Sequence, residues 1–231
     1  MTQDIANNIS NIQKNIAQAA KSCNRNPEDI TLIAVSKRKP IHEIKQALMA
    51  GQTHFGENYV QEFVTKHQDF NNPAIKWHFI GHLQKNKAKF LVGHIDLIHT
   101  LDRLSLAQVI NQLAEKKGFV QKCLIQVKLS QEESKHGILP EDVPNLITDL
   151  NGLNNLDVKG LMLIGTWTDD TDIQQKEFLT LRHLMDDLNE KNLYRSKLKE
   201  LSMGMSHDYA LAIKEGATMI RIGTDIFGER V

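Results

Sequence analysis

The residue best suited to covalent chemistry is a lysine at the end of a short apolar run. Lys37 follows Leu32-Ile33-Ala34-Val35-Ser36 and precedes Pro40. Four apolar, partly β-branched residues bounded by charge and proline favour a buried strand over a helix. On such a strand Lys37 shares the parity of the two β-branched residues, so its side chain points with theirs. Burial and the two basic residues that follow disfavour its ammonium form, so the amine is a candidate nucleophile towards a carbonyl. The alternative is a strand-end lysine whose amine reaches water.

Two later stretches end in small residues and hydroxyls that suit a phosphate. Ser202 and Ser206 lie in Leu201-Ser202-Met203-Gly204-Met205-Ser206-His207-Asp208, and Gly223-Thr224 follows a second apolar run. Backbone N–H groups at such turns, beside a helix N-terminus, bind phosphate oxygens. The alternative is that Ser206 caps a helix starting at His207 and that the glycines only make tight turns. Because the two stretches occur at successive predicted strand ends, we favour the phosphate site.

Two further polar residues are candidates for ligand contacts. Arg221 shares parity with Met219 and Gly223, so a barrel-facing guanidinium would need an acceptor inside. An internal salt bridge and a ligand contact are equally compatible with this pattern. Asn58 comes just after a predicted strand, where it could cap the next helix or contact a ligand, and capping is the simpler interpretation.

These candidates must be positioned by a repeating strand-and-helix pattern. An N-terminal helix from Ile5 to Cys23 comes first, and eight strands then alternate with helices, which predicts a single-domain (β/α)8 barrel over residues 1–231. An open doubly wound sheet is the alternative. The barrel rule places Lys37 at the functional rim. The expected strands after the Lys37 run are Thr53–Gly56, Trp77–Ile80, Ile95–Leu101, Lys122–Leu129, Val158–Ile164, Lys199–Met203 and Met219–Ile222; the expected helices include Asn58–His67, Lys85–Leu91, Leu104–Lys116, Glu141–Leu150, Ile173–Glu190 and His207–Glu215.

Composition excludes several classes of protein. In 231 residues, 28 Lys and Arg balance 28 Asp and Glu, so overall charge gives no reason to expect nucleic acid or an anionic membrane as a partner. No apolar run reaches membrane-spanning length and no signal segment is recognisable, so we expect a cytoplasmic protein. Cys23 and Cys123 have no metal or redox spacing and are expected to be free thiols. A glycine turn separates His78 from His82, and we expect no metal site.

The sequence resembles the family of pyridoxal 5′-phosphate (PLP) homeostasis proteins nearly end to end. The resemblance rests on long motifs rather than on single residues. They are Ala34-Val35-Ser36-Lys37 with Pro40, His54-Phe55-Gly56-Glu57-Asn58, Trp77-His78-Phe79-Ile80-Gly81-His82-Leu83-Gln84-Lys85-Asn86-Lys87, Leu201-Ser202-Met203-Gly204-Met205-Ser206, and Arg221-Ile222-Gly223 with Ile226-Phe227-Gly228.

The resemblance implies a barrel of the alanine racemase N-terminal-domain type that holds PLP as a Schiff base (aldimine) on Lys37. It also implies that Arg221 faces the pyridine nitrogen and that Asn58 lies near the ring. The phosphate contacts that it implies come from Ser202, Ser206, Gly223 and Thr224. The loop Gly165-Thr166-Trp167-Thr168 departs from the family pattern.

The implied function is storage, buffering or delivery of PLP without catalytic turnover. A permanent positive charge at the ring nitrogen disfavours its protonation and weakens the ring as an electron sink. The sequence after Thr224 is also too short for the added β-domain of barrel racemases. Apo-enzymes that use PLP are the expected recipients, and we expect a monomer. The alternatives are a low-activity amino-acid racemase with Lys37 as base, and an unrelated phosphate-ligand barrel in which Lys37 attacks a sugar carbonyl.

Overall fold

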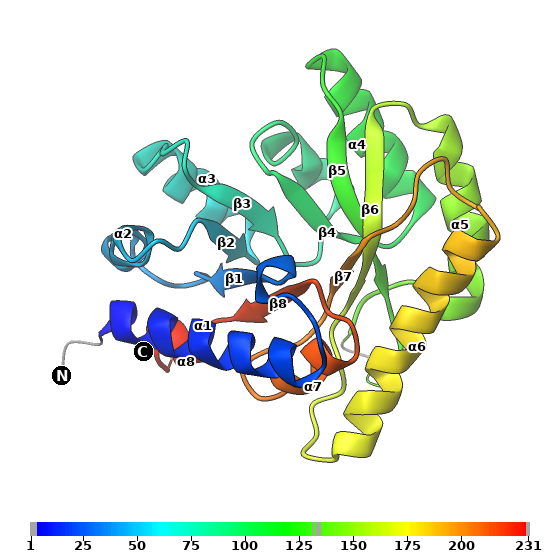
Figure 1. Ribbon diagram of the computed structural model, residues 1–231. Helices are drawn as coiled ribbons and strands as arrows, with labels where there is room; N and C mark the ends of the chain where they lie inside the picture. The colour runs from blue at the N-terminus through cyan, green and yellow to red at the C-terminus, as the bar shows by residue number, and fades with distance from the viewer. Residues whose placement is uncertain (1–3, 131, 133–134, 230–231) are drawn as a thin grey trace.

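Eight parallel strands form a closed barrel in the computed structural model, which describes residues 4–130, 132 and 135–229 (Figure 1). Each strand pairs with the next one along the chain, and the last pairs with the first. This confirms the predicted (β/α)8 barrel. The strands are β1 (Thr31–Val35), β2 (His54–Glu57), β3 (Lys76–Phe79), β4 (Leu97–Leu101), β5 (Gln121–Val127), β6 (Leu156–Leu163), β7 (Glu200–Ser202) and β8 (Met219–Ile222).

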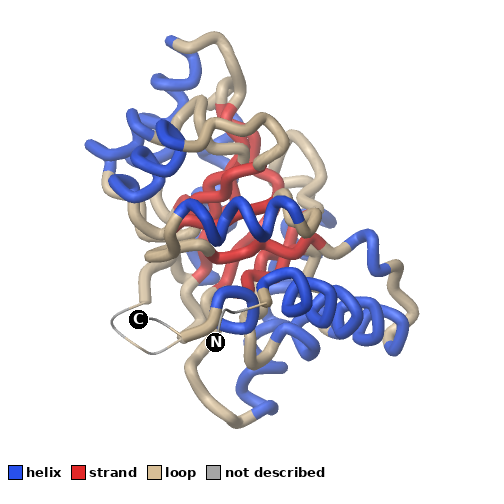
Figure 2. Tube along the Cα trace, turned by 90° about the vertical axis from the view of Figure 1, so that its left-hand side faces the viewer, coloured by secondary structure: helices blue, strands red, loops and turns tan. Residues whose placement is uncertain are grey.

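Helices surround the barrel and cover the outer face of its sheet (Figure 2), and the inner face closes around the barrel interior, so both faces are buried. This explains why most strands are buried at consecutive positions rather than at alternating ones. The helices are α1 (Ile5–Ser22), α2 (Ile41–Met49), α3 (Val60–Asp69), α4 (Leu104–Lys116), α5 (Val143–Asp149), α6 (Thr171–Glu190), α7 (Tyr209–Lys214) and α8 (Thr224–Phe227), with 3-10 turns η1 (Pro27–Asp29), η2 (Lys85–Phe90), η3 (Pro140–Asp142) and η4 (Leu150–Gly152).

The barrel interior has a small apolar core of its own. Side chains from five strands meet there, separate from the larger core between strands and helices, as is usual for such barrels. Because Ile33 and Met219 belong to this inner core, the side chain two residues after Met219 also points inward. That residue is Arg221. The inner core consists of Ile33, Leu97, Leu124, Met162 and Met219.

The N-terminal helix α1 packs on the outside of the barrel against α2, α7 and α8 (Figure 1). The Asp4 side chain caps it by accepting a hydrogen bond from the Asn7 N–H. Its apolar stripe is buried as the spacing predicts, from Ile5 through Ile9, Ile12 and Ile16 to Ala19. The amide of Asn8 donates to the Ile226 carbonyl at 3.0 Å, which ties this helix to the C-terminal end of the chain.

Two short segments differ from the sequence predictions. The helix expected over Lys85–Leu91 is the 3-10 segment η2, in which only Ala88 is buried, so no apolar face stabilises a longer α-helix. The four residues of α8 were not predicted, because one turn is too short to show a periodic pattern. Among the described residues, no helix is both long enough and apolar enough to cross a membrane.

Candidate functional site

Lys37 stands in the turn directly after β1, at the carboxyl-terminal rim of the barrel. Its side chain is half-buried, and the next residue, Arg38, has a left-handed φ of 60°. The register of β1 with β8 pairs Ile33 with Arg221. Further along, a Cβ added to Gly223 would lie 3.4 Å from Val35. Lys37 and the turn after β8 therefore leave the barrel side by side.

A buried ion pair supports this turn from below. The Ser36 hydroxyl donates to Glu57 Oε1 at 2.5 Å, and Lys66 Nζ donates to the same oxygen at 2.8 Å. Lys66 also donates to the Ser36 carbonyl at 2.6 Å, so one amine holds the residue before Lys37. Burial raises the pKa of Glu57, and the Lys66 charge opposes that rise. Sequence reasoning missed this pair, although Glu57 lies within the His54–Asn58 motif.

Arg221 points into the barrel and is 4 % exposed. Its Nη1 donates to Ser202 Oγ at 2.6 Å and its Nη2 to the Leu163 carbonyl at 2.7 Å. No carboxylate of the described residues forms an ion pair with it, so its partners are neutral, and the internal salt bridge that the sequence left open as one alternative is not found there. Burial lowers the pKa of Arg221 to about 10, which leaves the guanidinium charged at neutral pH. A guanidinium has five N–H donors, and these two contacts use two of them.

Three histidines continue from Ser202 through the barrel interior. His99 Nδ1 lies 2.9 Å from Ser202 Oγ, and His99 Nε2 lies 2.9 Å from His78 Nδ1. His78 Nε2 in turn lies 2.8 Å from His54 Nδ1. Desolvation lowers the pKa of His78 to about 3 and that of His99 well below its usual value, so both rings are neutral. Sequence reasoning missed this chain, because its histidines lie on three successive strands 24 and 21 residues apart and Ser202 lies on β7, 103 residues after His99.

Asn58 does not cap a helix, contrary to the simpler interpretation of its position. The N-cap of α3 is Tyr59, and no side-chain hydrogen bond caps that helix. The Asn58 Oδ1 atom is buried and has no hydrogen-bond partner among the described residues. Its backbone is held tightly, because a Cβ on Gly81 would lie 2.0 Å from the Asn58 carbonyl oxygen. A ligand at the rim would find a fixed, unused acceptor here.

The turn after β7 is shaped by Gly204 rather than by Ser206. Gly204 has a φ of +95°, and a Cβ there would lie 2.7 Å from the Ala212 side chain. Helix α7 begins at Tyr209 and its N-cap is Asp208, so Ser206 does not cap it. The Asp208 carboxylate instead accepts from the Met205 N–H at 2.5 Å. Ser206 is half-buried in this turn, and it does not cap the helix.

Gly223 and Thr224 lie in the neighbouring turn, because β7 pairs with β8. Gly223 is the N-cap of α8 and Thr224 is its first residue, with an exposed side chain. The structure thus brings the two small-residue turns to adjacent strand ends, as the sequence predicts.

The unusual loop after β6 lies at the same rim. Trp167 is 75 % exposed, and its ring lies against His207 with 4.5 Å between ring centroids. Thr166 is fixed by Glu177, which accepts from its N–H at 2.8 Å and from its hydroxyl at 2.5 Å. Across the rim, His82 and His136 stack with their centroids 3.9 Å apart.

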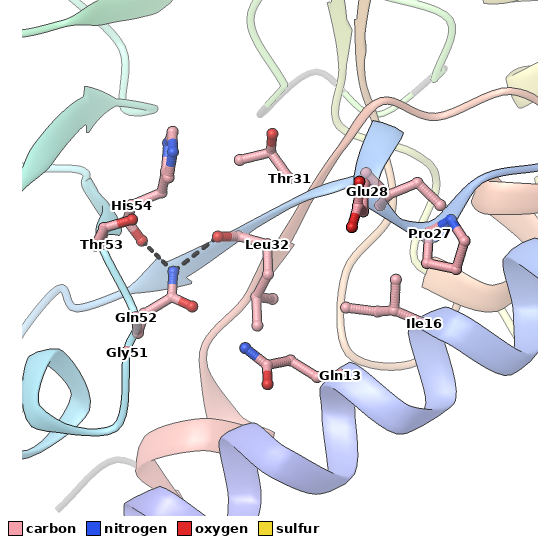
Figure 3. Close-up of a pocket in the computed structure, with 11 residues that line it drawn as sticks. Gln13, Ile16, Pro27, Glu28, Thr31, Leu32, Gly51, Gln52, Thr53 and His54 are labelled. Carbon is pink, nitrogen blue, oxygen red and sulfur yellow. Dashed lines mark hydrogen bonds between the residues drawn. The ribbon is translucent and has the colours of Figure 1, made fainter.

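A separate cavity of about 360 Å³ opens at the other end of β1 and β2 (Figure 3). It lies between these strand starts and α1, and the Gln52 amide bridges its wall by donating to the Leu32 and His54 carbonyls at 2.7 and 2.6 Å. The His54 backbone lines this cavity, whereas its ring points away from it and begins the histidine chain that ends at Arg221 (Figure 3). Because Lys37 follows the carboxyl end of β1, this cavity is distinct from the candidate site.

The two cysteines agree with the expectation from the sequence. Cys23 and Cys123 are both free thiols. In the described ranges, no group of three or more His, Cys, Asp or Glu side chains is arranged to hold a metal ion.

The chain is similar over nearly its whole length to known proteins. The family described as alanine racemase, N-terminal domain, matches residues 8–231. The pyridoxal phosphate homeostasis protein of Pasteurella multocida is 43 % identical over 98 % of this chain and 97 % of its own, and that of Escherichia coli is 40 % identical over 98 % and 97 %.

Solved structures show the same relationship. PipY of Synechococcus elongatus, with PLP bound, superimposes with a TM-score of 0.82 at 39 % identity, covering 92 % of this chain and 100 % of that one. An alanine racemase of Clostridium difficile gives a TM-score of 0.74 at 18 % identity, covering 98 % of this chain and 57 % of that one, which supports the fold alone.

Proposed function

Because this chain belongs to the pyridoxal phosphate homeostasis protein family, we propose that it binds PLP at the rim beside Lys37 and stores, buffers or delivers it. Relatives of about 40 % identity carry that name, and PipY has been solved with PLP bound. The observation that carries the proposal is the adjacency of β1 and β8. It sets the turn of Lys37 beside the strand of a buried, inward-facing Arg221.

The polar groups of this rim fit such a cofactor. PLP offers an aldehyde, a ring nitrogen and a phosphate, which need an amine, a donor and several hydrogen-bonding groups. Arg221 has N–H donors beyond those bonded to Ser202 and Leu163. Asn58 Oδ1 is buried without a partner, as expected of an atom whose partner is a ligand. The family resemblance assigns the phosphate to Ser202, Ser206, Gly223 and Thr224.

In this proposal Lys37 holds the cofactor covalently. When bound, PLP supplies an aldehyde that condenses with a lysine amine, with loss of water, to form a Schiff base. The bonds from Lys66 and Glu57 to Ser36 fix the backbone from which the Lys37 side chain extends. Arg38 Cζ lies 5.7 Å from the centroid of the Tyr59 ring, and the Arg38 N–H donates to the Glu62 carboxylate. These contacts fix the residue that follows Lys37.

The residue at the ring nitrogen favours a carrier over an enzyme. Arg221 retains its charge at neutral pH despite burial, and a fixed positive charge disfavours protonation of an adjacent ring nitrogen. The ring then withdraws electrons weakly, so carbanion chemistry on a bound amino acid is poorly supported. We therefore propose a carrier without turnover, cytoplasmic and monomeric, with apo-enzymes as recipients.

The absorption spectrum tests the binding proposal. Addition of PLP to the purified protein is expected to produce the visible band of a lysine Schiff base, and Lys37→Ala is expected to abolish it. Lys45→Ala is the matched control, because Lys45 is an exposed lysine of α2 and its loss should leave the band intact. A band that persists in the Lys37 variant would place the Schiff base elsewhere and reject the proposal.

A second measurement tests the absence of turnover. The PLP-loaded protein is incubated with L-amino acids in deuterium oxide, and exchange at the α-carbon is followed by proton NMR. The carrier function predicts no exchange beyond that of free PLP. Exchange that depends on Lys37 would favour the alternative, a PLP-dependent racemase.

A further inference from the structure

The chain of side chains from His54 to Arg221 joins the two ends of the barrel. It starts at the end of the barrel where the cavity beside α1 opens and passes through His78, His99 and Ser202. The four contacts measure 2.8, 2.9, 2.9 and 2.6 Å, so each is a hydrogen bond of ordinary length. All its members from His78 to Arg221 are at most 4 % exposed, which keeps water out of the chain.

Such a chain can exist in only two forms. A neutral imidazole carries one N–H and one bare nitrogen, so each ring donates at one end and accepts at the other. If His99 accepts from Ser202, then all three rings carry the proton on Nε2. If His99 donates to Ser202, all three carry it on Nδ1. Mixed forms leave one contact with two hydrogens or with none.

In the protein without ligand, the hydrogen bonds of Ser202 determine whether the histidines carry their protons on Nε2 or on Nδ1. Arg221 can only donate, so it always occupies a lone pair of the Ser202 oxygen. Within the described part of the chain, the other partner of this hydroxyl is His99 Nδ1. The hydroxyl proton is satisfied only if it is donated to that nitrogen, and a buried unsatisfied donor is costly. The unloaded protein should therefore have the form with Nε2 protonated on His99, His78 and His54.

We propose that PLP binding reverses the polarity of this chain and thereby switches the tautomer of His54 at the opposite end of the barrel. This inference rests on the proposed function, in which the PLP phosphate accepts a hydrogen bond from Ser202. Once the hydroxyl donates to a phosphate oxygen, it no longer donates to His99, and the form with Nδ1 protonated becomes the satisfied one. His99, His78 and His54 then act as positioning residues for Ser202 and Arg221, without touching the cofactor.

The reversal conserves protons and needs no movement of the heavy atoms. Ser202 Oγ gives its proton to His99 Nδ1, His99 Nε2 gives one to His78 Nδ1, and His78 Nε2 gives one to His54 Nδ1. His54 Nε2 releases a proton to water, and the entering phosphate, arriving as its monoanion, gives one to Ser202. The rings end neutral, as their burial requires.

The coupling works in both directions. A group at this end of the barrel that accepts from His54 Nε2 stabilises the unloaded form and weakens PLP binding by the same factor by which PLP weakens that contact. His54 meets the neighbouring cavity with its backbone, whose carbonyl accepts from Gln52, and its ring points away from Gln13 and Ile16 (Figure 3).

Nitrogen-15 NMR of ring-labelled histidine tests the inference directly, because protonated and bare ring nitrogens have well-separated chemical shifts. Spectra are recorded at mildly alkaline pH on the whole protein before and after loading with PLP, and the His54 signals are assigned with His54→Gln. We expect Nε2–H before loading and Nδ1–H after it. An unchanged His54 tautomer in a sample that shows the Schiff-base band would overturn the inference, whereas absence of the band would reject the proposed function, and the inference with it.

Two further experiments test whether the phosphate causes the tautomer change and whether the histidine chain transmits it. Pyridoxal, which has the aldehyde but no phosphate, should give the band without the switch, and a switch with pyridoxal would contradict the role of phosphate. His78→Phe interrupts the chain, so loading should no longer change His54; if that variant does not fold, His99→Phe makes the same test. His94→Gln is the control, since His94 lies outside the chain and its variant should keep the switch. A switch that survives interruption would show that the signal does not pass through these rings.

Discussion

Lys66 belongs to α3 but acts on the turn after β1, because its amine bonds both the Ser36 carbonyl and Glu57. Lys66→Met should leave the Glu57 carboxylate buried without its counter-ion and lower the free energy of unfolding by about 3–5 kcal/mol. Urea unfolding at neutral pH measures this. Lys45→Met, which changes an exposed lysine, should stay within about 0.5 kcal/mol of the original protein. A double variant, Lys66→Met with Glu57→Gln, should recover part of the loss, and equal losses in both would contradict this account.

Ser202 and Ser206 allow stability to be separated from PLP binding. Ser202→Ala leaves Arg221 Nη1 and His99 Nδ1 without their shared partner and should cost about 1–3 kcal/mol in the free energy of unfolding. Ser206→Ala removes a half-buried hydroxyl that caps no helix and should change that free energy by less than about 0.5 kcal/mol. If Ser206 binds the phosphate, its variant should still weaken PLP binding, which spectroscopic titration measures. Unchanged PLP affinity would remove Ser206 from the site.

At the scale of elements, the strands were predictable because burial on both faces leaves its mark in local sequence. The alternation of strands with helices located all eight, and parity along β8 predicted that Arg221 shares a face with Met219, which the structure places inside the barrel. The partners of Arg221 were not predictable, since Leu163 and Ser202 meet it only through the pairing of β6, β7 and β8. The same holds for the histidine chain and for the reach of Lys66 to Ser36. Local patterns therefore predict which residues face the site, and the register of the strands determines what they contact.

The turn from β7 to α7 depends on a glycine. Gly204→Ala would force a side chain into a backbone with φ of +95° and within 2.7 Å of the Ala212 Cβ. Because both effects are unfavourable, we expect a loss of more than about 1 kcal/mol in the free energy of unfolding. Gly152→Ala is the matched control, since a Cβ there meets nothing within 4 Å and its effect should lie within about 1 kcal/mol of zero. Similar losses for both variants in thermal unfolding would show that the turn tolerates a side chain.

At the scale of the whole molecule, the buried histidines make stability depend on pH. The pKa of His78 is about 3 in the folded protein against 6.5 when unfolded, so between these values the unfolded chain binds the extra proton. His78 therefore contributes its full share of stability above pH 6.5 and loses it as the pH falls towards 3. At 1.36 kcal/mol per pKa unit, this amounts to at most about 5 kcal/mol. The lowered pKa of His99 acts in the same direction.

Carboxylates also titrate between pH 6.5 and 3 and change the unfolding free energy. The contribution of His78 is therefore measured by comparing variants with the original protein. His78→Gln can donate and accept hydrogen bonds but does not titrate, and it should flatten the decline of the unfolding free energy between pH 6.5 and about 4. His42→Gln, at an exposed position of α2, should leave the decline unchanged. Urea unfolding across this range compares the three proteins. If His78→Gln and the original protein lose stability in parallel, then the interior admits the proton without unfolding, and the chain of neutral rings through the barrel is not held as the structure indicates.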